Sequence, residues 1–191
     1  MENAPCIQAD SSRRNLSCGA VTGVCFAREA TAGEAPELPL LEQSRGAGST
    51  SDVDFWTGKD VREVVNSHLN YVVADTKQWE QSAAYLIDTH PRVEAFVKNA
   101  GLGFGIPYFN NGEPHEFIPD FVIRFKDREN FHLILETKGY DKLRDIKESA
   151  AKRWCAAVNH HGGFGTWEFK MVDGPAGVLP ALKSSMSEAV H

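Results

Sequence analysis

The sequence predicts an α/β domain in which a helix, three strands, a second helix and a final strand build a mixed sheet flanked by helices. Three observations predict this order. Residues 117–125 and 131–138 alternate between two faces on either side of a short polar turn, which is typical of an antiparallel hairpin. Apolar residues recur at helical spacing before this hairpin and again after it. The aromatic-rich residues 166–172 then predict a last strand.

Composition divides the chain into three parts. Residues 1–52 are rich in Ala, Gly, Ser, Glu and Pro without sustained periodicity, so we expect them to be mostly disordered. Residues 53–173 are expected to form the folded domain, and residues 174–191 a flexible tail. An alternative for the first part is a twin-arginine signal, because Arg13-Arg14 precedes an apolar stretch and Ala30-Thr31-Ala32 has the form of a cleavage site. That stretch is short and interrupted by glycine, which favours disorder.

Three patterns before the hairpin predict helices. Residues 61–69 and residues 93–97 have valines, Leu or Phe at helical spacing. Residues 79–87 predict a longer helix, with Asp75 or Thr76 in a capping position before it and a proline beyond its end.

Extended and turn segments separate these helices from the rest of the domain. Val72-Val73 predicts the start of an extended segment, and residues 106–109 a short strand that ends in an Asn-Asn-Gly turn. After the hairpin, Asp141 can cap a helix whose apolar residues run from 143 to 158. Basic residues on this helix make it a candidate for DNA contact, against the alternative of a solvated charged face.

Charge and cysteine usage exclude several classes of protein. The net charge of −6 does not suit a nucleic-acid binder that relies on bulk charge, so any DNA contact needs a local patch or a partner. The four cysteines lack CxxC spacing, which argues against a zinc site or a disulfide framework. No apolar run approaches the length of a membrane span. We therefore expect a cytoplasmic protein without a membrane partner.

The hairpin carries the candidate chemistry. If its turn centres on Arg128, Asp120 and Glu136 lie directly opposite, with Cβ atoms about 4.5–5.5 Å apart, and Glu136 shares a face with Lys138. Odd-numbered positions form an apolar core face, and even-numbered positions form a mixed face with all three groups. Two opposed carboxylates need a cation between them, and oxygen ligands of this kind suit Mg²⁺. The alternative is an exposed ion pair that contributes little.

Residues 55–172 resemble the C-terminal endonuclease region of the restriction subunits of type III restriction enzymes, within the PD-(D/E)xK nuclease superfamily. The following segments carry the resemblance: Ser67-His68-Leu69-Asn70, Trp79-Glu80, Phe96-Val97-Lys98-Asn99, Ile106-Pro107-Tyr108, Pro119-Asp120-Phe121, Leu135-Glu136-Thr137-Lys138-Gly139, Arg153-Trp154 and Val158-Asn159. The resemblance implies a restriction-endonuclease-like αβββαβ core and a metal-dependent DNA endonuclease, a hydrolase of phage defence.

The resemblance also implies roles by position. Asp120 and Glu136 would bind Mg²⁺, for which Mn²⁺ can substitute, and Lys138 would position the attacking water and stabilise charge at the phosphate. A further catalytic carboxylate from the preceding elements would be Glu80, with Glu94 as the alternative. DNA would be the substrate.

The chain departs from the full-length restriction subunits. No G-x-x-x-x-G-K-[ST] motif is present, so we expect no ATP site and no translocase in this chain. A separate translocase and a modification subunit would then be partners, and the chain resembles a detached endonuclease domain or a gene fragment. Two alternatives remain open. One is a catalytically silent remnant that binds DNA or a subunit of a restriction-modification system. The other is a free-standing repair nuclease for structured DNA.

Overall fold

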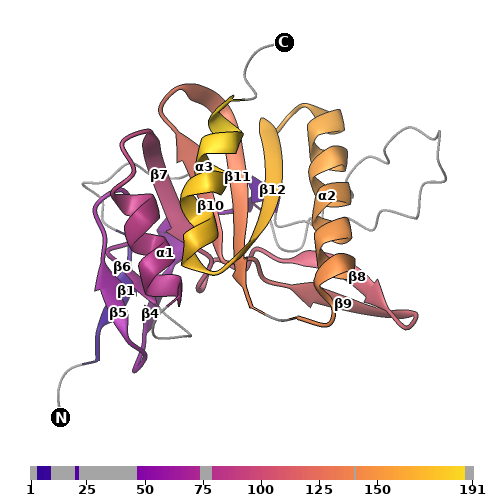
Figure 1. Ribbon diagram of the computed structural model, residues 1–191. Helices are drawn as coiled ribbons and strands as arrows, with labels where there is room; N and C mark the ends of the chain where they lie inside the picture. Colours follow the sequence, from indigo (N-terminus) through magenta and orange to yellow (C-terminus); the bar gives the residue numbers. More distant parts are fainter. Residues whose placement is uncertain (1–3, 10–19, 22–46, 74–78, 140, 188–191) are drawn as a thin grey trace.

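A four-stranded mixed sheet forms the centre of the protein. The computed structural model describes residues 4–9, 20–21, 47–73, 79–139 and 141–187. The sheet has the order β12-β11-β10-β7 (Figure 1). Its strands are β7 (Val93–Lys98), β10 (Phe121–Phe125), β11 (Arg128–Lys138) and β12 (Thr166–Asp173). The pairs β7–β10 and β10–β11 are antiparallel and β11–β12 is parallel, so the predicted α/β class with a mixed sheet is confirmed.

The predicted register of the hairpin is confirmed over residues 121–124, but the turn does not centre on Arg128, because the register shifts after Arg124 and Phe125 pairs with Arg128, the first residue of β11. Phe121 pairs with Leu135 and Arg124 with His132, and one further step of this register sets Asp120 opposite Glu136. The prediction of one strand over residues 117–125 is wrong, because β9 (Glu113–Phe117) ends before Ile118-Pro119-Asp120 and β10 starts only after it. Proline has no N–H for the sheet ladder, which explains the break.

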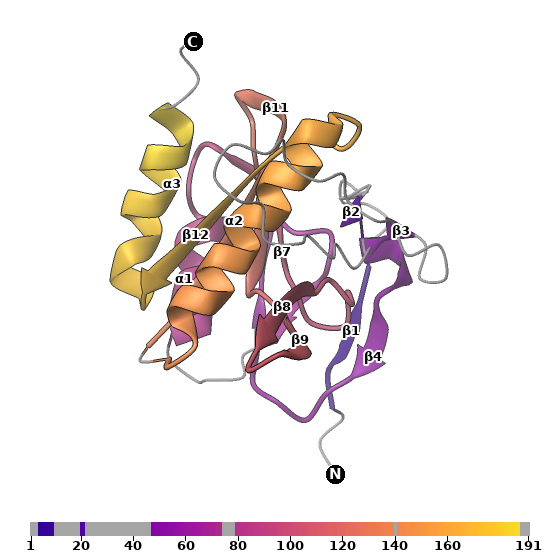
Figure 2. The ribbon, with the colours of Figure 1, turned by 90° about the vertical axis from the view of Figure 1, so that its right-hand side faces the viewer.

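Helices cover both faces of the sheet (Figures 1 and 2). Helices α1 (Trp79–Asp88) and α3 (Val178–Ser187) pack with the odd-numbered residues of the hairpin. Helix α2 (Arg144–His161), with β8 (Ile106–Asn110) and β9, packs on the other face, where Val122 and Ile134 are buried. The even-numbered face is therefore a second core at its centre. Its polar residues lie at its two ends, with Asp120, Glu136 and Lys138 at one end and Arg124 and His132 at the other. In the described residues, no helix has the length and apolarity required to span a membrane.

Two predicted helices are strands. Residues 61–69 contain β5 (Val61–Glu63), which pairs with β6 (Tyr71–Val73), and residues 93–97 lie in β7. The two faces of strand β7 contribute to different hydrophobic cores, so apolar residues occupy most of its positions. Such a strand has no strict alternation, and its spacing can match that of a helix. The helix over residues 79–87 is confirmed as α1, while its capping residues Asp75 and Thr76 lie outside the described residues.

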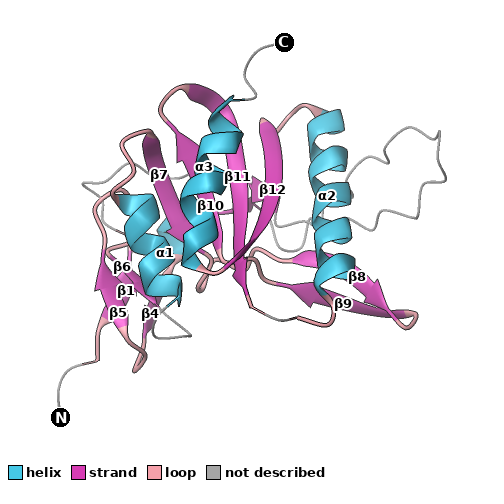
Figure 3. Ribbon diagram, in the orientation of Figure 1, coloured by secondary structure: helices cyan, strands magenta, loops and turns pink. Residues whose placement is uncertain are grey.

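The two short strands before the hairpin form their own sheet (Figure 3). Strand β8 confirms the strand predicted over residues 106–109, but it pairs with β9 and not with the central sheet. The Asn-Asn-Gly turn joins them, with positive φ at Asn111 and Gly112. Helix α2 and strand β12 confirm the elements predicted after the hairpin, although α2 begins at Arg144.

Both ends of the chain contribute structure. Within residues 1–52, β1 (Cys6–Gln8) pairs with β4 (Asp54–Trp56), and Ile7 is fully buried; short elements follow in β2 (Ala20–Val21), β3 (Ala47–Gly48) and η1 (Thr50–Asp52). The Arg13-Arg14 segment lies outside the described residues. Instead of the predicted flexible tail, η2 (Pro175–Gly177) leads into α3. Its buried residues Val178, Ala181, Leu182 and Met186 follow helical spacing, so α1 and the sheet stabilise it by apolar burial.

The ring of His132 is buried in the sheet beside Trp167. The two ring centroids are 4.4 Å apart in a stacked arrangement. Burial, together with the nearby Arg124 guanidinium, lowers the pKa of His132 to about 4, from an ordinary value of 6.5. The folded protein therefore holds this ring neutral at pH values where the unfolded chain protonates it.

Replacing His132 with phenylalanine is expected to reduce the acid sensitivity of the fold. Between pH 6.5 and about 4 the unfolded chain binds more protons at His132 than the folded protein does. The neutral ring therefore makes its full contribution to the free energy of unfolding above pH 6.5. This contribution is lost as the pH falls toward 4, and the loss is about 3 kcal/mol at ~1.4 kcal/mol per pKa unit. Urea unfolding at neutral pH and inside this window measures the loss. An unchanged loss in His132→Phe would contradict the assignment.

Candidate active site

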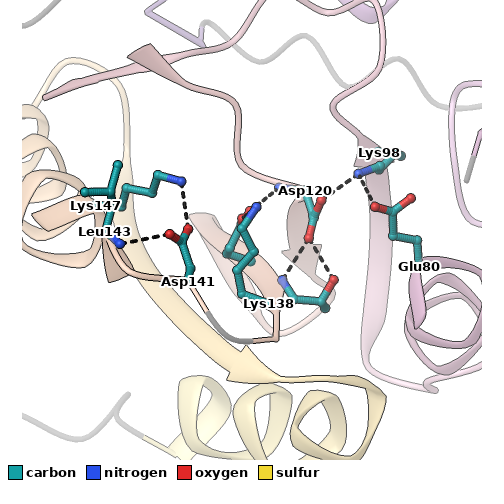
Figure 4. Close-up of polar contacts among 9 residues, drawn as sticks. Glu80, Lys98, Asp120, Lys138, Asp141, Leu143 and Lys147 are labelled. Atoms are coloured by element: carbon teal, nitrogen blue, oxygen red, sulfur yellow. Dashed lines mark hydrogen bonds and ion pairs between the residues drawn. The ribbon is translucent and has the colours of Figure 1, made fainter. Parts of the chain in front are cut away.

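The sequence-predicted site lies where three strands of the central sheet end or begin. Strand β7 ends at Lys98, β10 begins just after Asp120, and β11 ends at Lys138. The break at Pro119 places Asp120 just before β10, where its backbone carbonyl accepts from the N–H of Asn99 at 2.8 Å and the register of the hairpin sets it against the end of β11. Segments distant in the sequence therefore meet at one edge, where Figure 4 shows their side chains converging.

The carboxylate of Asp120 is held by donors from two strands. Its Oδ2 accepts from the backbone N–H of Thr137 at 2.8 Å and from the Thr137 hydroxyl at 2.7 Å. Its Oδ1 accepts from Nζ of Lys98 at 2.6 Å. Asp120 is only 9% exposed, so these bonds fix its orientation in a region of reduced solvent screening.

Glu136 is the most buried charged group of the site, at 2% exposed. Its Oε2 accepts from the backbone N–H of Asp120 at 2.9 Å, and its Oε1 lies 3.2 Å from Nζ of Lys138. Burial and then the Asp120 carboxylate raise the pKa of Glu136 well above its usual range, and Lys138 opposes this. Two neighbouring buried carboxylates leave an excess of negative charge, which a cation would relieve.

Lys138 connects the buried carboxylate to solvent. Its side chain is 40% exposed, while Glu136 beneath it is buried. Burial lowers the pKa of Lys138, but Glu136 and Asp120 outweigh burial and leave the pKa above its ordinary value. The amine is therefore a charged group at the surface of the site, where a phosphate can approach.

Lys98 is a member of the site that the sequence analysis did not identify. It is buried, and its Nζ also lies 3.7 Å from Oε1 of Glu80 and 5.4 Å from the ring centroid of Phe121. Figure 4 shows Asp120 and Glu80 pointing at this amine from two sides. A lysine is rarely buried unless it is paired. The available signal was a charged residue directly after the apolar residues 95–97.

The two candidate glutamates have different places. Glu80 on α1 is buried and reaches the site through Lys98. Glu94 lies near the other end of β7, where its Oε2 is 3.3 Å from the Arg124 guanidinium. The structure thus brings Glu80 to Asp120 and pairs Glu94 elsewhere.

Helix α2 borders the site with paired charges. Asp141 does not directly precede the helix, but its carboxylate accepts from the N–H of Leu143 at 2.9 Å and from Nζ of Lys147 at 2.7 Å. These bonds lower the pKa of Asp141. Arg144 pairs with Asp173, and Lys152 with Glu148. Acidic partners thus offset much of the basic character that made this helix a candidate for DNA contact.

The donor set fits a hard divalent cation. Among the described residues, no three His, Cys, Asp or Glu side chains gather as a preformed metal cage. Mg²⁺ typically keeps several waters and takes only one or two carboxylates, which Asp120 and Glu136 provide. The Lys98 amine donates to Oδ1 of Asp120, so a cation bound at this oxygen would compete with that amine.

Comparison with known proteins identifies no relative. No family model, no curated protein and no solved structure matches the chain.

Proposed function

We propose that this chain is a Mg²⁺-dependent DNA endonuclease domain that hydrolyses phosphodiester bonds. One observation carries the proposal: Asp120, Glu136 and Lys138 meet at one end of the sheet, where the Glu136 carboxylate accepts from the backbone N–H of Asp120 and pairs with the Lys138 amine. This arrangement offers oxygen ligands for a cation and a charged amine beside them.

The order of the elements supports a restriction-endonuclease-like core. Helix α1, strands β7, β10 and β11, helix α2 and strand β12 follow one another as αβββαβ around the central sheet. The sequence analysis predicted the same order but took residues 106–109 as the first of the three strands. In the structure that first strand is β7. The site lies where β7 and β11 end and β10 begins.

Each residue has a chemical role in this proposal. Asp120 and Glu136 would hold Mg²⁺, or Mn²⁺ in its place, which would supply an activated water and neutralise charge on the phosphate. Lys138 would orient the water and stabilise the negative charge that develops at the phosphoryl oxygens. Glu80 would act through Lys98, which it contacts.

The proposed context is a restriction-modification system. The chain would supply the cleavage domain of a type III restriction enzyme, with the ATP-driven translocase and the modification subunit as separate partners. A catalytically silent, DNA- or subunit-binding domain is the second candidate. It is favoured by the engagement of both Asp120 oxygens with Lys98 and Thr137, which leaves a cation to compete for them.

Metal dependence tests the proposal directly. Purified chain is incubated with plasmid and with short duplex DNA, in Mg²⁺ or in EDTA. We expect cleavage only with Mg²⁺, because two acidic side chains cannot neutralise a phosphate without a cation. A Glu136→Gln variant purified in the same way controls for contaminating nucleases. Absence of cleavage by folded wild-type protein would favour the silent domain, and EDTA-resistant cleavage would contradict the metal mechanism.

A further inference from the structure

An open cavity lies beside the candidate active site, on the outer side of helix α1. Its volume is about 820 Å³, and its walls include Arg62, Trp79, Tyr85, Leu86 and Pro175. Trp79 is 43% exposed and Tyr85, six residues later on α1, is 48% exposed, which is high for large aromatic side chains. The cavity therefore presents aromatic surface to solvent.

Trp79 links the cavity to the segments that carry the site. Trp79 directly precedes Glu80, which contacts Lys98 in the site. The ring of Trp79 also lies against Gly139, the residue after Lys138, because a Cβ built on that glycine would lie 3.3 Å from the indole. Trp79 is thus the sequence neighbour of Glu80 on α1 and lies against the residue that follows Lys138. A nucleotide whose phosphate lies at Lys138 would have its neighbouring base within reach of this side chain.

The chemistry of the walls suits a nucleobase. Aromatic side chains offer flat faces on which bases stack without regard to sequence. The Arg62 guanidinium lies 4.6 Å from the centroid of the Tyr85 ring, so a cation borders the aromatic surface. A base inside an intact duplex is stacked on its neighbours and cannot use such a surface, whereas an unpaired base can.

We propose that this cavity, with Trp79 as its stacking platform, binds an unpaired nucleobase next to the scissile phosphate. The inference rests on the proposed nuclease function and names its substrate class, which is DNA with single-stranded or extruded nucleotides at the cleavage position. Arg62 contributes its positive charge to the adjoining phosphate.

Binding in EDTA tests the cavity without cleavage. Fluorescence anisotropy compares a labelled oligothymidylate with an abasic oligonucleotide of equal length and charge. We expect wild type to prefer the thymidylate, and Trp79→Ala to bind it about tenfold more weakly with little change toward the abasic strand. Trp79→Phe and Tyr85→Ala provide a milder change of the same wall. Trp56→Ala removes an exposed indole outside the cavity and should bind as wild type does.

The following outcomes decide whether the cavity binds a base. Equal affinity of wild type for the two strands would overturn it, and so would a Trp79→Ala variant that folds and keeps the preference. If Trp79→Ala unfolds, the two milder variants decide. Loss of the preference for thymidylate in Trp79→Phe or Tyr85→Ala would support the cavity, and a preference kept by both variants would overturn the proposal. Cleavage in Mg²⁺ is a separate readout. Base-dependent binding without cleavage would contradict the nuclease function alone, and cleavage without base-dependent binding would contradict the cavity alone.

Discussion

Replacing Asp120 with asparagine is expected to abolish Mg²⁺-dependent DNA cleavage. The amide keeps the size of the side chain and can still accept from Thr137, so the hairpin should retain its geometry. It removes the negative charge that a divalent cation requires beside Glu136. Loss of one preorganised electrostatic group at a reacting centre costs about 10²–10³ in rate, and loss of a metal ligand should cost at least as much. Single-turnover cleavage with excess protein measures the rate.

The chain offers a matched control for this substitution. Glu94→Gln removes a carboxylate of β7 that pairs with Arg124 away from the site, and its cleavage rate should match wild type. Lys138→Met removes the amine but no proposed metal ligand, so it should lower the rate while Mg²⁺ still binds. Wild-type rates in both Asp120→Asn and Lys138→Met would show that this end of the sheet is not the active centre.

Replacing Lys98 with methionine is expected to destabilise the fold by about 3–5 kcal/mol, the usual cost of removing one partner from a buried ion pair. The amine is the only cation that the structure places on Oδ1 of Asp120 within the described residues, and it also approaches Glu80. Without it, the buried carboxylates of Asp120 and Glu80 lose the amine that both approach. Urea unfolding in EDTA measures the change. Lys152→Met, which breaks an exposed pair with Glu148, should cost under ~1 kcal/mol.

Two further measurements separate this charge effect from lost packing. In the double variant Lys98→Met/Asp120→Asn the destabilisation should be smaller than the sum of the two single effects, because the unpaired charge is gone. Mg²⁺ should stabilise Lys98→Met more than wild type, since the cation then meets no competing amine at Asp120. Additive destabilisation, together with an unchanged response to Mg²⁺, would assign Lys98 a packing role only.

Local patterns in the sequence were enough to predict the pairing of the hairpin strands and the next two elements, α2 and β12. Alternating apolar residues and a polar turn near Arg128 fixed which residues face each other, and the register from Phe121 to Arg124 follows that prediction. The juxtaposition of Asp120 with Glu136 and Lys138 depends only on this register. Period-two and period-3.6 patterns arise when one face of an element is buried, so such elements can be identified without knowing their neighbours.

Only the tertiary structure decided whether two kinds of segment form helices or strands. These are segments buried on both sides, and the segment at the C-terminal end of the chain. Strand β7 has apolar residues toward both cores, so its sequence has no alternation that separates it from a helix. Helix α3 forms because α1 and the sheet cover its apolar face. The role of Lys98 depends on the pairing of β7 with β10, which sets it opposite Phe121 and beside Asp120. No local pattern contains that contact, because it is made by packing segments that are distant in the sequence.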